Sequence, residues 1–254
     1  MIINQKALVE GPAKVFVTGT DTGVGKTTVT QALCRALQQL EVRVGVRKPV
    51  SSGACYQQRQ LRNEDALALM DAVGMPVTPE NYQRVNPFCY APAIAPHIAA
   101  AHQQQSLSTN RIAAHIHASI DTEELLVIEG AGGWLVPLSM EETMADVATA
   151  LNAEVILVIG MQLGCINHAL LTVADIQRRG LTLVGWVGNQ LTPEPMVCCA
   201  ENYDTLARMI PAPCWAKIPF SPEPETLTRL LLPLAQRLAT GNNPAAALPP
   251  ASHP

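Results

Sequence analysis

Residues Val15 to Leu33, VFVTGTDTGVGKTTVTQAL, decide the fold that this chain is expected to adopt. An apolar run ends at Thr18, a turn that contains glycines follows, and a helical pattern begins near Lys26. The backbone N–H groups of such a turn and of the helix N-terminus form a concave site for an anion. Gly23 and Gly25 permit backbone angles and close approaches that a side chain would prevent. The stretch therefore predicts a phosphate-binding loop, and with it a nucleotide site.

The spacing of this loop differs from the commonest nucleotide-binding pattern. Five residues, rather than four, separate Gly19 from the triplet Gly25-Lys26-Thr27. Lys26 can reach the β- and γ-phosphates of a nucleotide, and the Thr27 hydroxyl can ligate Mg²⁺. We expect ATP to contact the loop and the first helical turn at Gly23, Val24, Gly25, Lys26, Thr27 and Thr28.

Short apolar runs alternate with helical patterns along the chain, a rhythm typical of βαβ units and a mainly parallel sheet. Near-continuous apolar runs suit strands that are buried on both faces. We predict strands at residues 14–19, 43–50, 125–130, 154–160, 183–189 and 214–220. We predict helices at residues 26–39, 64–72, 109–119, 144–151, 166–179 and 200–209. The predicted fold class is α/β, of the P-loop NTPase type, with a twisted sheet flanked by helices on both faces.

The length of 254 residues suits one ordinary α/β domain, which we place at residues 1–240. Residues 241–254 are rich in Pro and Ala and carry little that could pack, which predicts a disordered tail. The proline-containing residues 81–96 are expected to form an ordered excursion on the surface.

The composition excludes several classes of function. The net charge is −4 and no Lys/Arg cluster occurs, which argues against nucleic acid as the main partner. The seven cysteines form no CxxC pair, so we expect reduced thiols, as in the cytoplasm, rather than disulfides or a zinc site. Residues 1–14 lack the pattern of a signal peptide. Residues 155–174 are uncharged, but polar residues and glycines interrupt them, which favours a buried strand and a helix over a membrane span.

Charged and hydroxyl side chains follow the predicted strands where ligands of parallel sheets collect. Glu129 ends one strand and could hold Mg²⁺, although a solvated carboxylate at a strand end is the alternative. Lys48 follows another strand, and the Ser51-Ser52-Gly53 turn after it suits an oxyanion. Asp65 lies near a helix start, where an acid also favours the helix dipole, and the residues alone favour that interpretation.

Eight segments occur together and in order: TGTDTGVGKT, KPVSSG, LRNEDALAL, VNPF…APHIA, IEGAGGWLVPLS, LGCINHALLT, GWVGNQLTP and RMIPAP. This set resembles the ATP-dependent dethiobiotin synthetases across roughly residues 14–220. The most specific part is EGAGGW combined with GCINHALLT and the longer loop. Related partitioning and nitrogenase-type ATPases carry a signature lysine four residues before the second glycine of the loop, where this chain has Asp21.

The resemblance implies a definite reaction. The family takes 7,8-diaminononanoate, CO₂ and MgATP and releases dethiobiotin, ADP and phosphate. A carbamate forms on the N7 amine, ATP phosphorylates it to a carbamic–phosphoric anhydride, and the N8 amine attacks to close the ureido ring. Phosphoryl transfer needs positioning and charge neutralisation more than a nucleophilic side chain.

The resemblance also implies roles for individual residues. Lys26 and Lys48 would neutralise the transferred phosphoryl group, and Thr22 and Ser52 would bind carbamate and phosphate oxygens. The implied Mg²⁺ shell consists of Thr27, Asp65 and Glu129, and the implied adenine site of Asn189, Ile218 and Pro219. The start of a helix would bind the substrate carboxylate through Gly164, Cys165 and Asn167 of the partner subunit. The expected assembly is therefore a homodimer with active sites at the subunit interface.

Three departures from the family pattern concern substrate choice. Gly23 stands where many members have an acidic residue, and Arg47 replaces a tyrosine and would add a charge at the site or its rim. Asn202 stands where a substrate-contacting tyrosine often lies, with Tyr203 one place later. Two alternatives therefore remain: a paralogue that acts on another diamine, or a regulatory P-loop switch ATPase. A non-catalytic copy is disfavoured because every expected lysine and metal ligand is present.

Overall fold

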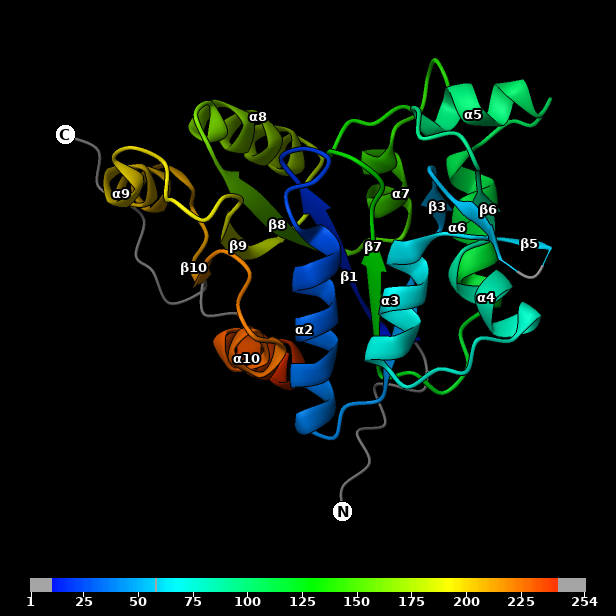
Figure 1. Cartoon of the computed structure of the whole chain (residues 1–254), viewed down its shortest axis with the longest axis horizontal. Coiled ribbons are helices and arrows are strands. Elements are labelled where there is room, and N and C mark those ends of the chain that lie inside the picture. The colour runs from blue at the N-terminus through cyan, green and yellow to red at the C-terminus, as the bar shows by residue number, and fades with distance from the viewer. Residues whose placement is uncertain (1–10, 58, 242–254) are drawn as a thin grey trace.

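A sheet of six parallel strands forms the centre of the molecule (Figure 1). The computed structural model describes residues 11–57 and 59–241. The order across the sheet is β10–β9–β8–β1–β7–β2. The strands are β1 (Ala13–Gly19), β2 (Val44–Arg47), β7 (Leu125–Glu129), β8 (Glu154–Met161), β9 (Leu183–Gln190) and β10 (Cys214–Ile218). Each predicted strand overlaps one of these, so the predicted parallel sheet is confirmed.

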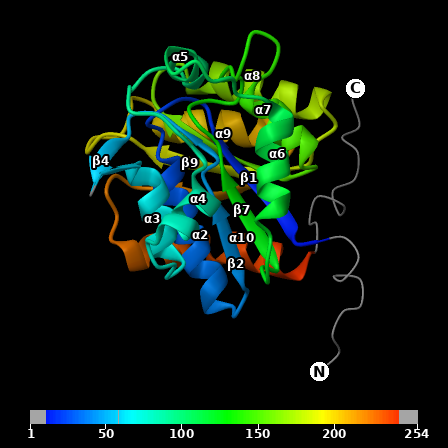
Figure 2. The ribbon, with the colours of Figure 1, turned by 90° about the vertical axis from the view of Figure 1, so that its right-hand side faces the viewer.

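Helices cover both faces of the sheet, as predicted (Figures 1 and 2). On one face lie α2 (Lys26–Gln39), α3 (Glu64–Ala72) and α10 (Pro224–Thr240). On the other lie α6 (Thr109–Ala118), α7 (Met144–Ala150), α8 (Cys165–Arg178) and α9 (Cys199–Met209). Strand β1 shows the alternation that separates two cores: Val15 and Val17 pack with the first group, and Phe16 packs with the second. Burial of both faces explains the continuous apolar runs.

The connections place a crevice at the carboxyl end of β1. The chain leaves β1 toward α2 on one face, whereas it leaves β7 and β8, the neighbours of β1, toward α7 and α8 on the other face. Ligands of open α/β sheets bind at such a switch point, because the diverging chains leave space there. The phosphate-binding loop lies at this point.

Several elements were not predicted. They are α4 (Pro79–Val85), α5 (Pro96–His102), α10 and the short strands β3 (Val50–Ser51), β4 (Cys55–Gln57), β5 (Gln60–Arg62) and β6 (Phe88–Cys89). Helix α10 was missed because Pro233 lies inside it, and a proline normally interrupts a helix. The single strand predicted at 43–50 is wrong, since it is divided near Pro49, which has no N–H group to donate, and β3 pairs with β6 instead.

Three further predictions concern the extent of the chain. Residues 81–96, expected to be an ordered surface excursion, contain the end of α4 and strand β6. The disordered tail falls almost entirely on residues 242–254, which lie outside the described residues. One domain over residues 1–240 stays a prediction. Among the described residues, no helix combines the length and apolarity needed to cross a membrane.

The expectation that the Arg47 charge lies at the site or its rim is wrong. The Arg47 guanidinium is fully buried and donates from Nε to the Ser119 hydroxyl at 2.9 Å. Nη2 also pairs with Oε1 of Glu123 at 3.1 Å. Residues 119–123 precede β7, so the guanidinium lies toward the amino end of that strand, away from the phosphate-binding loop. Arg47 therefore anchors α6 and the start of β7.

We predict that Arg47→Met lowers the free energy of unfolding by about 3–5 kcal/mol, because it leaves the Glu123 carboxylate without its buried partner. Urea denaturation measures the effect. Arg47→Met/Glu123→Gln should recover part of the loss. The control Arg35→Met, whose pair with Asp71 is solvent-exposed, should cost less than about 1 kcal/mol. Equal costs for the two single variants would contradict the structural role of Arg47.

Candidate active site

The phosphate-binding loop connects β1 to α2 and packs against the carboxyl end of β9. Gly25, at the N-cap of α2, has a φ of 92°, a left-handed conformation that favours glycine. The Asn189 side chain donates from Nδ2 to the Val24 carbonyl oxygen at 2.9 Å. A Cβ atom at Gly25 would overlap this amide group. The glycine is therefore required both by the backbone and by its neighbour.

Lys26 lies in this loop with its side chain folded back. Its ammonium donates to the carbonyl oxygen of Asp21 at 2.8 Å and is largely buried. The pKa of Lys26 is lowered to about 8, first because of burial and secondly because of the Lys48 ammonium nearby. The two lysines are thus close enough to repel each other, and an anion between them would relieve this repulsion.

Lys48, Glu129, Asp65 and Thr27 form an ion cluster at the carboxyl edge of the sheet. Lys48 Nζ lies 2.6 Å from Glu129 Oε1 and 3.2 Å from Asp65 Oδ2. Thr27 Oγ1 donates to the same Glu129 oxygen at 2.9 Å. Burial opposes the charge on Lys48, but Glu129 and Asp65 outweigh it and raise the pKa of this lysine. Four residues predicted for the site are therefore brought together.

Asp65 lies in the first turn of α3, where it favours the helix dipole, and it also contacts Lys48 of the ion cluster. The cap of α3 is Asn63, whose Oδ1 accepts from the Ala66 amide at 3.2 Å. Burial raises the pKa of Asp65, but Lys48 and the Thr27 hydroxyl outweigh it, so this pKa is lowered. Asp65 therefore belongs to the ion cluster and is not needed as the cap.

The donor set of this cluster fits a Mg²⁺ ion. Glu129 is fully buried, and its second oxygen, Oε2, has no hydrogen-bond partner among the described residues. An unpaired buried carboxylate oxygen is costly, and a cation would satisfy it. Thr27, Asp65 and Glu129 offer only oxygen atoms, which Mg²⁺ prefers, and water and phosphate would complete its shell. This set contains only two carboxylates, Asp65 and Glu129. In residues 11–57 and 59–241, no cluster of three or more His, Cys, Asp or Glu side chains suited to a metal occurs.

The predicted adenine-binding residues adjoin one another at the ends of β9 and β10. Asn189 and Ile218 are register partners in these two strands, and the exposed Pro219 follows directly. Asn189 lies within β9, as the strand predicted at residues 183–189 implies. The pairing of Asn189 with Val24 joins this group to the phosphate-binding loop.

Thr22 and Ser52 lie near the ion cluster without joining it. Thr22 is exposed in the loop, and its hydroxyl faces Gly132, where an added Cβ would lie 3.4 Å away. The carbonyl oxygen of Ser52 accepts from Asn63 at 3.3 Å. Neither hydroxyl bonds to Lys48 or Glu129 in the described part of the chain. Their roles stay predictions.

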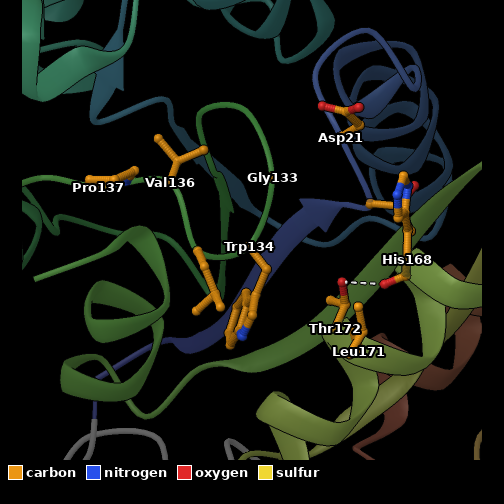
Figure 3. Close-up of a pocket in the computed structure, with 10 residues that line it drawn as sticks. Asp21, Gly133, Trp134, Val136, Pro137, His168, Leu171 and Thr172 are labelled. Carbon is orange, nitrogen blue, oxygen red and sulfur yellow. Dashed lines mark hydrogen bonds between the residues drawn. The ribbon is translucent and has the colours of Figure 1, made fainter.

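A pocket of about 430 Å³ opens beside the phosphate-binding loop (Figure 3). It is lined by Thr20, Asp21, Gly133, Trp134, Leu135, Val136, Pro137, His168, Leu171 and Thr172. Trp134 belongs both to the core and to the wall of this pocket. It is almost fully buried. The α8 residues of the pocket were missed because a helix start rich in polar residues is common; only the GCINHALLT segment pointed to them.

The chain resembles known proteins over most of its length. A family model described as an AAA domain matches residues 13–226. The ATP-dependent dethiobiotin synthetase BioD of Cellvibrio japonicus is 47% identical over 204 residues, which cover 80% of this chain and 88% of that protein. The chain belongs to the ATP-dependent dethiobiotin synthetase family.

Other members of the dethiobiotin synthetase family match to a similar extent. BioD 1 of Escherichia coli K12 is 44% identical over 210 residues, covering 83% of this chain and 92% of that protein. BioD of Pseudomonas aeruginosa UCBPP-PA14 is 43% identical over 205 residues, which cover 80% of this chain and 88% of that protein. Among solved structures, a ParA family ATPase from Chlorobium tepidum is 14% identical, covers 94% and 93%, and has a TM-score of 0.48.

The start of α8, expected in a dethiobiotin synthetase to receive the substrate carboxylate, lies on the surface. Gly164 caps the helix with a φ of 95°, Cys165 is buried and Asn167 is exposed. Large apolar side chains at Leu163 and Leu171 are exposed on either side. These residues do not meet the ion cluster within this chain.

Tyr203 lies one position after the place where a substrate-contacting tyrosine is expected, and it belongs to the core. It is buried and stacks on Trp186, with ring centroids 6.0 Å apart. The side chain of Asn202 donates to the Cys198 carbonyl oxygen at 2.8 Å on the surface of α9. Neither residue lines the pocket beside the loop.

We predict that Gly25→Ala destabilises the protein by about 1–3 kcal/mol more than Gly23→Ala. Both glycines have positive φ, so both variants carry backbone strain. A Cβ at Gly23 meets no atom within 4 Å, whereas one at Gly25 overlaps Asn189. Urea denaturation compares the two, and Gly25→Ala/Asn189→Ala should remove the difference. Equal stabilities of the two single variants would rule out the overlap.

Proposed function

We propose that this protein closes the ureido ring of dethiobiotin from 7,8-diaminononanoate, CO₂ and ATP, with release of ADP and phosphate. The supporting observation is the ion cluster of Thr27, Lys48, Asp65 and Glu129, which lies beside Lys26 at the switch point of the sheet. The chain that carries this cluster belongs to the dethiobiotin synthetase family. No nucleophilic side chain is needed, because the substrate amines are the nucleophiles and the protein supplies position and charge.

The two lysines carry the largest role in this proposal. Lys26 would leave the Asp21 carbonyl and hold the γ-phosphate, while Lys48 neutralises the opposite side of the developing charge. Thr22 and Ser52 would donate hydrogen bonds to the carbamate and phosphate oxygens. These donors act mainly in the transition state, where the charge is spread over the phosphoryl oxygens.

Nucleotide and metal would occupy the groups that the fold places around these lysines. Residues Gly23 to Thr28 would hold the phosphates, and Asn189, Ile218 and Pro219 would enclose the adenine. Thr27, Asp65 and Glu129 would hold Mg²⁺, which when bound screens the phosphate charge and orients the nucleotide.

A homodimer would complete each site. The exposed Leu163 lies beside the start of α8, and a partner subunit would cover this apolar side chain. The partner's helix start would then offer its N–H groups to the substrate carboxylate through Gly164, Cys165 and Asn167. A cytoplasmic location is proposed because the seven cysteines are free thiols.

Diamine-dependent ADP release tests the proposed function. With MgATP and bicarbonate present, 7,8-diaminononanoate should strongly stimulate ADP release by the wild-type protein. Lys26→Gln and Lys48→Gln should each lower kcat by about 10²–10³-fold. Lys14→Gln changes a lysine at the opposite end of β1 and should remain near wild type.

The outcomes separate the alternatives. Nucleotide binding without any response to this diamine, but with a response to another, would indicate a paralogue. A near-wild-type rate in either lysine variant would remove that residue from the mechanism.

Mixing two weakly active variants tests the shared site. We predict that Lys26→Gln and Asn167→Asp, each weakly active alone, recover up to about a quarter of wild-type activity after mixing and subunit exchange. Recovery is expected because each mixed dimer would contain one site free of both changes. Light scattering gives the oligomeric state. A monomer, or mixed dimers without recovery, would show that each site is built from a single chain.

A further inference from the structure

The carboxylate of Asp175, on α8, accepts a hydrogen bond from the indole N–H group of Trp134. Trp134 Nε1 donates to Asp175 Oδ2 at 2.8 Å, and Arg179 Nε donates to the same oxygen at 2.6 Å. The other oxygen accepts from Arg178 at 2.6 Å. Burial raises the pKa of Asp175, but hydrogen bonds from Arg179, Arg178 and Trp134 outweigh it, so this pKa is lowered. The carboxylate is therefore a fixed, ionised acceptor.

The same set of contacts continues to α7. Arg179 Nη1 donates to Asp146 Oδ1 at 2.7 Å. The other oxygen of Asp146 accepts from the backbone and hydroxyl groups of Thr143, at 2.6 and 2.7 Å. Trp134 lies inside the loop of residues 130–143 that connects β7 to α7, and Thr143 is the last residue of this loop. Asp175 and Arg179 therefore hold this loop at two points, at Trp134 directly and at Thr143 through Asp146.

This loop and α8 form facing walls of the pocket beside the phosphate-binding loop (Figure 3). Trp134, Val136 and Pro137 belong to the loop wall, and Leu171 and Thr172 belong to the helix wall. Asp175 lies one helical turn beyond Leu171 and Thr172 on the same helix. One helix thus supplies one wall and anchors the other.

The Trp134 ring is restrained from two sides. It packs against Phe16 of β1 in an edge-to-face arrangement, with ring centroids 6.2 Å apart and an angle of 79° between the rings. Asp175 holds the N–H edge of the ring, while core packing holds the rest of it. Loss of the hydrogen bond would free the ring to turn without removing it from the core.

We infer that Asp175 is a positioning residue that, through Trp134, sets the width of this pocket and thereby the affinity for the substrate's carbon chain. The inference rests on the proposed function. The pocket suits such a chain because its walls are largely apolar while Thr20 and Asp21 provide polar groups at the phosphate-binding loop. A diamine with a long methylene chain needs both the apolar walls, for its carbon chain, and the polar groups, for its reacting end.

Kinetics on Asp175→Ala, Asp175→Asn, Trp134→Phe and the double variant Asp175→Ala/Trp134→Phe test this inference. Each single variant should raise KM for 7,8-diaminononanoate about five- to tenfold and change KM for ATP less than about twofold. The double variant should match the singles, because both remove the same contact. The control Glu154→Gln disrupts a bidentate ion pair with Arg237, outside the pocket, and should leave both KM values unchanged.

The indole N–H resonances in a ¹H–¹⁵N spectrum provide a readout that does not depend on activity. Trp134→Phe identifies the Trp134 signal, which should shift in Asp175→Ala and shift less in Asp175→Asn, which keeps an acceptor oxygen. An unchanged signal would overturn the contact itself. A shifted signal with an unchanged diamine KM would overturn its role in substrate affinity. A wild-type protein without diamine-dependent ADP release would instead overturn the proposed function, and the inferred role with it.

Discussion

The buried contact between Lys48 and Glu129 is the interaction on which the rest of the site depends. Glu129 is fully buried, Lys48 is nearly so, and their charged atoms lie 2.6 Å apart. Neither charge could be buried alone, because the cost of removing it from water would exceed the gain from packing. The pair therefore fixes the end of β7 against the chain that follows β2. Thr27 and Asp65 join it, so the phosphate-binding loop and α3 are placed by the same contact.

This cluster is charged in a way that packing alone does not explain. A buried ion pair is weak evidence for stability, and apolar residues could fill the same space. Here a second ammonium, Lys26, lies beside the first, with its pKa lowered to about 8 by burial and by Lys48. One oxygen of Glu129 has no partner among the described residues. Two ammonium groups and an unpaired carboxylate oxygen are suited to a phosphate chain and a cation, which explains why these residue types occur together.

Sequence reasoning reached the features that depend on local pattern and missed those that depend on distant partners. The strands, the loop and the residues at strand ends followed from apolar runs and from where parallel strands bring their ends together. The direction of the Arg47 side chain could not be predicted in this way, because its partner Ser119 lies 72 residues away. The contact that supports the pocket wall could not be predicted either, since Trp134 and Asp175 are 41 residues apart in the sequence. Helix α10 was hidden by Pro233, although its leucines recur at helical spacing.

Isotope incorporation tests the central claim most directly, because ring closure requires a new carbon atom from CO₂. The wild-type protein would be incubated with ¹³C-bicarbonate, 7,8-diaminononanoate and MgATP, and the product analysed by mass spectrometry. The account predicts dethiobiotin that carries the label in its ureido carbon, in an amount equal to the ADP released. ADP release without labelled product, or labelled product without ATP, would contradict it.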